Sequence, residues 1–174
     1  MPRRIAPAPA PTGLRRHLLR APIRLYRWHL GWLLGARFLL LTHVGRVSGQ
    51  PRHVVLEVVG RDAQTGAYHL ASGFGPRSDW YRNIRQHAGV EVQVGRHRLS
   101  GYARPMTREQ SGRAMAVYAL RRPRAARRLM AFCGLEVDGT SQDYFLVGRD
   151  HIPFVAVHPA ALGAPLSRGT QLAG

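Results

Sequence analysis

Residues 38–59, FLLLTHVGRVSGQPRHVVLEVV, decide the fold that we predict for this chain. The stretch begins with a short apolar run and ends in a segment rich in β-branched residues, and both are typical of strands. Between them, residues 44–51 contain two glycines, a proline and an arginine, which favours a tight loop. The stretch therefore predicts an antiparallel hairpin of strands at 38–43 and 52–60.

The hairpin loop has the residue types of an anion site. Gly45 and Gly49 permit a positive φ and let a ligand approach the main chain closely. Successive amides in such a loop can form an anion-binding concavity, which Arg46 and Arg52 would flank with positive charge. The alternative is an ordinary hairpin loop with solvated arginines. The residues alone leave both interpretations open.

The charge of the chain points to an anionic partner. Its 174 residues suffice for one domain with a sizeable core. The 26 basic residues, all arginine, outnumber 9 acidic ones, which gives a net charge of +17. Anionic lipid, a multiply charged cofactor or nucleic acid would suit this charge. We find no helix-turn-helix or zinc module, so the sequence argues against nucleic acid.

The side chains of classical catalysis and metal binding are scarce. Cys133 is the single cysteine, so it forms no intrachain disulfide, and it is expected to be a small core residue in a reducing cytoplasm. Nine histidines without tight spacing predict no metal site. Paired carboxylates are also few. A bound cofactor could carry the chemistry instead, and hydride transfer fits such a protein.

The N-terminal part divides into two segments. Residues 1–12 are rich in Pro and Ala and are predicted to be disordered, without a secretory signal. Residues 13–36 predict two amphipathic helices interrupted at Pro22, with arginines on one face and leucines and tryptophans opposite. Such helices would lie on anionic lipid at the inner face of the cell membrane, or cap one end of a barrel. Their apolar run is too short to span a bilayer.

The remaining elements complete an α+β chain that is mainly β. We expect strand 67–72, a helix after Ser78, strands 90–95 and 97–104, helices at 108–120 and from Pro123, strands at 144–147 and 152–157, and a loose tail over 160–174. The first three strands would form an antiparallel meander. The five arginines of residues 121–128 are either a solvated face or a docking surface for an anion.

Three blocks of the chain resemble the deazaflavin-dependent nitroreductase family. Residues 45–52, GRVSGQPR, are similar to its G-R-x-[ST]-G-x-P-R signature. The second block is residues 71–75, ASGFG, followed by DWYRNI at 79–84, and the third is IPFV at 152–155. The resemblance implies a split β-barrel of antiparallel strands over residues 37–159, flanked by helices, with coenzyme F420 as the cofactor. Related barrels bind FMN or FAD, which is the alternative.

The resemblance also implies site residues and a reaction. The expected cofactor-binding residues are Arg46, Val47, Ser48, Gly49, Pro51, Arg52, Ser72, Gly73, Phe74, Gly75, Trp80 and Asn83. The amides of residues 46–49 would hold the cofactor phosphate, and residues 72–75 would line the ring. Reduced F420 would give a hydride to an enone, quinone or nitro compound in a pocket that includes Trp28, Trp32 and Tyr144. The helical face that Trp80 shares with Ile84 and His87 favours a core position for it over a cofactor contact, and Asn83 could cap neighbouring backbone.

Two departures from the family pattern leave the substrate open. Gly73 stands where members often have Lys, and the tyrosine-rich segment of the best-known nitroreductases is missing between residues 123 and 150. No catalytic residue is assigned. The family often dimerises, so a homodimer is expected. A non-catalytic basic module on lipid or nucleic acid is the alternative from another functional class.

Overall fold

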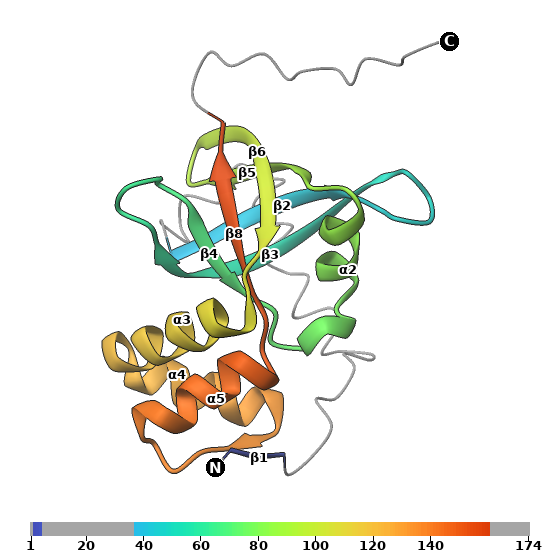
Figure 1. The fold of residues 1–174 in the computed structure, drawn as a ribbon. Helices are drawn as coiled ribbons and strands as arrows, with labels where there is room; N and C mark the ends of the chain where they lie inside the picture. Colours follow the sequence, from blue (N-terminus) through green and yellow to red (C-terminus); the bar gives the residue numbers. More distant parts are fainter. Residues whose placement is uncertain (1, 5–36, 161–174) are drawn as a thin grey trace.

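The computed structural model describes residues 2–4 and 37–160. Within them, six antiparallel strands form a closed barrel, and a layer of three helices packs at one end of it (Figure 1). The barrel strands are β2 (Phe38–Val44), β3 (Pro51–Arg61), β4 (Tyr68–Ala71), β5 (Gly89–Val94), β6 (His97–Pro105) and β8 (Phe154–Pro159). Their order is β2-β3-β4-β8-β6-β5, and β5 closes the barrel by pairing with β2.

The predicted meander is confirmed. β2 pairs with β3 from Phe38 opposite Glu57 to Val44 opposite Pro51. β3 pairs in turn with β4, with an irregularity between Val58 and Gly60. Every second residue of β2 is buried, which is the period of a strand with one face in the core.

The interior of the barrel is apolar. Leu39, Leu41, Leu70 and Val92 are fully or almost fully buried there, and Ile84 of α2 (Asp79–Gln86) packs against them. Each such side chain contributes roughly 1.5–3 kcal/mol when it leaves water. The barrel is therefore a packed core, and any ligand site has to lie at its ends or on its outer face.

Residues typical of helix N-termini precede or begin several of the helices. Their bounds are η2 (Gly75–Arg77), α2 (Asp79–Gln86), α3 (Arg108–Arg121), α4 (Pro123–Cys133) and α5 (Ser141–Asp150). Thr107 and Gln110 form a capping box at the start of α3, and Pro123 is the first residue of α4. The predicted starts of these two helices are thus confirmed.

The helical layer has its own core, which includes Met115, Tyr118, Met130 and Val147. α3 and α5 approach closely because Gly148 faces the backbone of Ser111. Cys133 is 2% exposed in this core, as expected for a small buried residue.

The strand predicted at residues 144–147 is wrong. This segment lies in α5, because the Thr140 hydroxyl accepts a hydrogen bond from the Asp143 amide and caps a helix there. Tyr144 and Val147, three residues apart, are both buried on the side of the helical core. The apolar run alone resembled a short buried strand, and the N-cap decides between the two.

Part of the N-terminal prediction falls on described residues. Arg3–Arg4 form β1, which pairs antiparallel with β7 (Leu135–Glu136) in the helical layer, although residues 1–12 were expected to be disordered. The predicted amphipathic helices of residues 13–36 and the tail beyond residue 160 lie outside the described residues. Among the described helices, none is long and apolar enough to cross a bilayer.

Candidate functional site

The loop between β2 and β3 is closed by its own backbone. The Gly45 amide donates to the Gln50 carbonyl at 2.9 Å, and the Gly49 amide donates to the Gly45 carbonyl at 2.8 Å. Gly49 has a φ of 64°, as expected, but Gly45 does not have a positive φ. A Cβ at Gly45 would lie 3.2 Å from the Gln50 carbonyl oxygen, so close packing of the loop favours glycine there.

Arg46 is anchored to α2. Its amide and its Nη1 both donate to Oδ1 of Asn83, at 3.2 and 2.9 Å. Its Nη2 lies 3.0 Å from Oδ1 of Asp79 in the first turn of α2. Only 22% of the Arg46 side chain is exposed. The guanidinium is therefore paired within the protein, and it fixes the loop in place, which the sequence did not predict.

Asn83 extends this anchor to a buried histidine. Its Nδ2 lies 3.1 Å from Nδ1 of His43, and both residues are 4% exposed. Because Asn83 donates, the Nδ1 of His43 accepts, which places the proton of the neutral ring on Nε2. Burial is the main cause that lowers the pKa of His43. The alternation of β2, which buries Leu39 and Leu41, is the signal that could have found His43.

The outer side of the loop presents donors that fit an anion. Val47 is 91% exposed, and the amides of Val47 and Ser48 have no hydrogen-bond partner among the described residues. The Ser48 hydroxyl lies 3.4 Å from Nη2 of Arg52, and Arg52 forms no ion pair with a described acidic residue. Two free amides beside a guanidinium suit a phosphate group. The residues present thus fit the phosphate of a cofactor.

The second block, residues 71–75, joins β4 to α2. The hydroxyls of Ser72 and Ser78 lie 2.8 Å apart, and both are within hydrogen-bond distance of the Gly75 carbonyl. Ser78 occupies the predicted N-cap position of α2, but its hydroxyl makes no cap bond to the helix. Ser72 is fully buried, so its side chain holds the turn together.

Gly73 and Phe74 pack the same turn against α4. A Cβ at Gly73 would meet Sγ of Cys133 at 3.4 Å, which is ordinary contact. The ring of Phe74 lies edge-on to Phe132, with 5.2 Å between the centroids. The turn therefore lies where α2, the barrel and the helical layer meet (Figure 1).

The other expected site residues are placed as follows. Pro51 is the first residue of β3, opposite Val44. Trp80 is 8% exposed in the barrel core, and Tyr144 is 5% exposed in the core of the helical layer. Trp28 and Trp32 lie outside the described residues. α2 thus brings together the loop of residues 45–50 and the turn of residues 72–78, whereas Tyr144 belongs to another layer.

A second polar cluster, which the sequence did not predict, surrounds Glu57. Its Oε1 accepts from the Tyr118 hydroxyl at 3.3 Å and from Nε of Arg37 at 3.2 Å, and Nη1 of Arg122 lies at 3.6 Å. Burial, and then the Glu57 charge, raise the pKa of Tyr118 to about 12. Sequence patterns missed this cluster because its members are up to 85 residues apart and join two layers.

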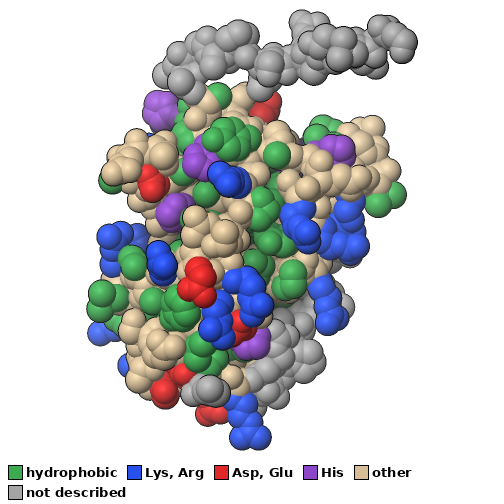
Figure 2. All heavy atoms as spheres, viewed as in Figure 1, with side chains coloured by type: hydrophobic (Ala, Val, Ile, Leu, Met, Phe, Trp, Pro, Cys, Tyr) green, Lys and Arg blue, Asp and Glu red, His purple; other side chains and the backbone are tan. Residues whose placement is uncertain are grey.

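Charge gathers where the barrel meets the helices. Figure 2 shows basic side chains around this junction, with fewer acidic ones among them. The five arginines of residues 121–128 are exposed, which agrees with a solvated face. In the part of the chain that the structure describes, no cluster of three His, Cys, Asp or Glu side chains could hold a metal ion.

Comparisons with known proteins agree with this architecture. The family model described as F420H(2)-dependent quinone reductase matches residues 23–130. A search of curated proteins gives no match. One similar solved structure is an F420-H2-dependent reductase (FDR-A), 23% identical over 70% of this chain and 94% of that one, with a TM-score of 0.48.

Another similar structure is the protein Atu2129 of Agrobacterium tumefaciens, described as of unknown function. It is 16% identical over 88% of this chain and 60% of that one, with a TM-score of 0.52, so the likeness concerns the fold. The family match covers more than half of the chain. The chain therefore belongs to the F420H(2)-dependent quinone reductase family, and it is a deazaflavin-dependent reductase of the split β-barrel fold that uses coenzyme F420.

Proposed function

We propose that this reductase transfers a hydride from reduced F420 to an electron-poor small organic acceptor. Quinones are the first candidates, because the matching family carries that description, and enones and nitro compounds share the same electron demand. The observation that carries the proposal is the anchored loop. Asn83 and Asp79 hold Arg46, and the loop turns two free amides and Arg52 outward.

The loop would bind the phosphate of the cofactor. The amides of Val47 and Ser48 would donate to its oxygens, and Arg52 would balance its charge. Arg46 acts here as a positioning residue, because its own charge is matched by Asp79. Fixed donors of this kind need no reordering when the ligand arrives, which favours binding.

The turn of residues 72–75 would border the ring of the cofactor. It lies beside the N-terminus of α2, and the contact of Phe74 with Phe132 makes one apolar boundary. When bound, reduced F420 supplies the hydride. The residues of the chain would supply position and fixed charge, which is how a site poor in acid–base side chains can still direct the reaction.

A fluorescence titration with oxidised F420 tests the binding site, with FMN and FAD in parallel. We expect F420 to bind and Arg52→Gln to weaken its binding by about tenfold. Arg113→Gln is the matched control, because it removes the same charge from an exposed position on α3. Tight binding of FMN or FAD in place of F420 would contradict the proposal.

A spectrophotometric assay then tests the acceptor class. Oxidation of reduced F420 is followed with a quinone, an enone and a nitro compound at equal concentration. We expect turnover with the quinone and a loss of turnover in Arg52→Gln at limiting cofactor. A protein that binds F420 but oxidises its reduced form with none of the three acceptors would refute the acceptor class.

We further propose a homodimer. All residues of β3 from Val54 to Gly60 are only half-buried within the described part of the chain, so this strand can still lose exposed area to a second copy. Light scattering of the purified protein tests this, and a monomer at all concentrations would contradict it.

Contact of the basic residues 13–36 with an anionic membrane stays a prediction, because those residues lie outside the described part. Sedimentation with vesicles that contain anionic lipid, compared with neutral vesicles, tests this prediction.

A further inference from the structure

A cavity opens at the end of β3 that lies away from the anchored loop. Its volume is about 320 Å³, at the lower end of the range of small-molecule pockets, about 300–1,000 Å³. Val58, Val59 and Val94 and the rings of Tyr68 and Tyr118 give it apolar walls. Such walls suit a small aromatic body.

Three arginines line the same cavity. Arg61 is held in place, because its Nε donates to the Gly66 carbonyl at 3.2 Å and its guanidinium lies 5.0 Å from the centroid of the Tyr68 ring. Arg122 lies 3.6 Å from Glu57. Arg121 is exposed and has no ion pair with a described residue. Basic groups therefore line a cavity whose walls are apolar.

Glu57 is the carboxylate that could oppose this charge, and it is already shared. Nε of Arg37 lies 3.2 Å from its Oε1, and Arg122 and the Tyr118 hydroxyl contact the same oxygen. Glu57 thus pairs with Arg37 and Arg122, and no described acidic residue forms an ion pair with Arg61 or Arg121. The surplus of positive charge favours a ligand that carries an anionic group.

We propose that this cavity binds a small aromatic ligand with an acidic substituent, such as an ionised hydroxyquinone. The acidic group would lie at Arg121 and Arg122, and the ring would lie against the valines and tyrosines. This inference goes beyond the proposed function, because none of the residues that line the cavity belongs to the loop of residues 45–52 or to the turn of residues 72–75, which would hold the cofactor. Val58 is six residues after Arg52 on β3, about 20 Å along the strand, so such a ligand leaves the loop free for phosphate.

Two quinones of similar shape test the ligand class. 2-Hydroxy-1,4-naphthoquinone is an anion at neutral pH, whereas 2-methoxy-1,4-naphthoquinone is neutral. Calorimetric titration of the full chain without cofactor measures both affinities. We expect the hydroxyquinone to bind about tenfold more tightly, and we expect this preference to shrink as salt is added. Equal affinities would overturn the proposal.

Variants with matched charge locate the site. The double variant Arg121→Gln/Arg122→Gln should reduce the preference to about twofold or less. The double variant Arg124→Gln/Arg127→Gln removes the same charge from exposed positions of α4 outside the cavity, and it should keep the preference. An equal loss in both would overturn the proposal. If the first variant unfolds, Arg121→Gln alone gives the test, because Arg121 makes no ion pair with a described residue.

The same titration, repeated in saturating oxidised F420, tests whether the cavity and the cofactor site are separate. Unchanged or tighter binding of the hydroxyquinone supports a ligand site separate from the cofactor site. Competitive displacement by F420 would show that the cofactor covers the cavity, and it would overturn the inference. Turnover of reduced F420 is measured separately. A protein that prefers the hydroxyquinone but oxidises reduced F420 with none of the three acceptors would refute the proposed function and leave the ligand class of the cavity supported.

Discussion

The Nη1 of Arg46 lies 2.9 Å from Oδ1 of Asn83, and this contact ties the loop after β2 to the middle of α2. The amide nitrogen of Asn83 turns the other way, to Nδ1 of His43. One buried side chain thus joins a strand, a helix and the loop that presents the free amides of Val47 and Ser48. The conformation of that loop is therefore held by Asn83, which lies 37 residues after Arg46 in the sequence.

Replacement of Asn83 by leucine should destabilise the protein and weaken F420 binding together. It leaves the buried Nδ1 of His43 and the amide of Arg46 without their partner, at a cost of about 1–3 kcal/mol. Urea unfolding and F420 titration measure the two effects. Asn83→Asp is the comparison, because it keeps the acceptor for Arg46. Full F420 affinity in Asn83→Leu would show that the anchor does not position the loop.

His43 should make stability depend on pH near neutrality. Burial, the largest cause, lowers the pKa of His43 below its ordinary 6.5, so the unfolded chain binds the proton more readily. The contribution is complete above pH 6.5 and is lost as the pH falls toward the lowered pKa of the folded state. Burial lowers the pKa of His69 in the same direction. We therefore compare wild type with His43→Gln.

Urea unfolding between about pH 7.5 and 5.5 measures this dependence. The wild type should lose stability toward the acidic end, and His43→Gln should lose less, with His69 accounting for the remainder. Parallel curves for the two proteins would contradict the assignment to His43.

Strands and helix starts could be predicted because their signals are local. The β-branched run of β3, the alternation of β5 and the Thr107 cap each lie within a few residues. The prediction of a strand at residues 144–147, which lie in α5, was wrong because a four-residue apolar run fits a strand and a helix equally. Thr140, the N-cap of α5, is the local signal that favours the helix.

Only part of the candidate site could be predicted from the sequence. The motif of residues 45–52 allowed either an anion-binding loop or an ordinary hairpin loop. The amides of Val47 and Ser48 have no partner among the described residues, and anion binding there stays a prediction. Its partners could not be predicted, since Asp79 and Asn83 reach Arg46 only after α2 has packed on the barrel. Glu57 and Tyr118, which are 61 residues apart, illustrate the same limit. Spacing within a motif says nothing about contacts between layers.

Tyr118 should ionise above the ordinary range of a tyrosine in an alkaline titration. Burial and the Glu57 charge raise its pKa to about 12, above the ordinary 10. Because the folded state keeps this proton, its contribution to stability is complete below pH 10 and is lost as the pH rises toward about 12. Phenolate absorbance follows the titration. Tyr118→Phe should remove the component near pH 12, and an unchanged curve would contradict the assignment.

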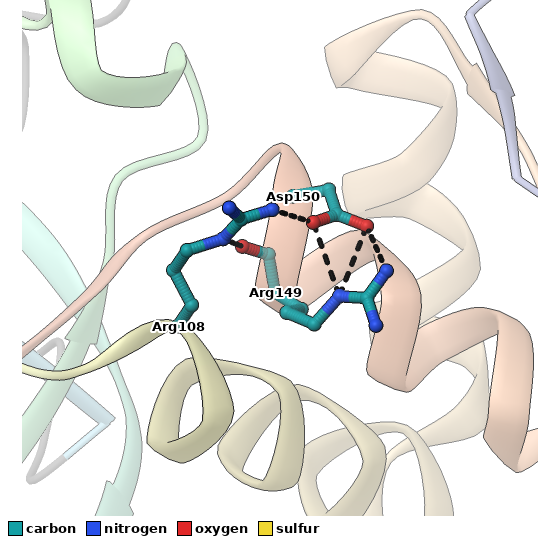
Figure 3. A network of polar contacts seen from close by, with 3 residues as sticks. All are labelled: Arg108, Arg149 and Asp150. Atoms are coloured by element: carbon teal, nitrogen blue, oxygen red, sulfur yellow. Dashed lines mark hydrogen bonds and ion pairs between the residues drawn. The ribbon is translucent and has the colours of Figure 1, made fainter.

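The contribution of Asp150 to the stability of the contact between α3 and α5 should be lost at acid pH. Nε and Nη2 of Arg149 lie 3.1 and 2.8 Å from its two oxygens, and Arg108 of α3 contacts the same carboxylate (Figure 3). The hydrogen bond from Arg149 is the main cause that lowers the pKa of Asp150 to about 2. This contribution is complete above pH 3.8 and is lost as the pH falls toward about 2.

Thermal unfolding of Asp150→Asn tests this junction. At neutral pH the variant should melt a few degrees below wild type, and the difference should shrink near pH 3. Glu136→Gln is the comparison, because it removes one acidic charge from an exposed position in β7. A difference that stays constant down to low pH would assign the effect to something other than the carboxylate charge.

Gly148 should be the least replaceable glycine of the helical layer. A Cβ there would press on the Ser111 carbonyl and lie 2.7 Å from the Cβ of Met115, so α3 and α5 would have to separate. Gly148→Ala should cost about 1–3 kcal/mol, with a clear fall in Tm. Gly89→Ala is the matched control, since no atom lies within 4 Å of a Cβ at that position. Because Gly148 lies in the helical layer, the folded variant should keep the F420 affinity of the barrel loop. Equal melting temperatures for the two variants would show that the helices can separate at no cost.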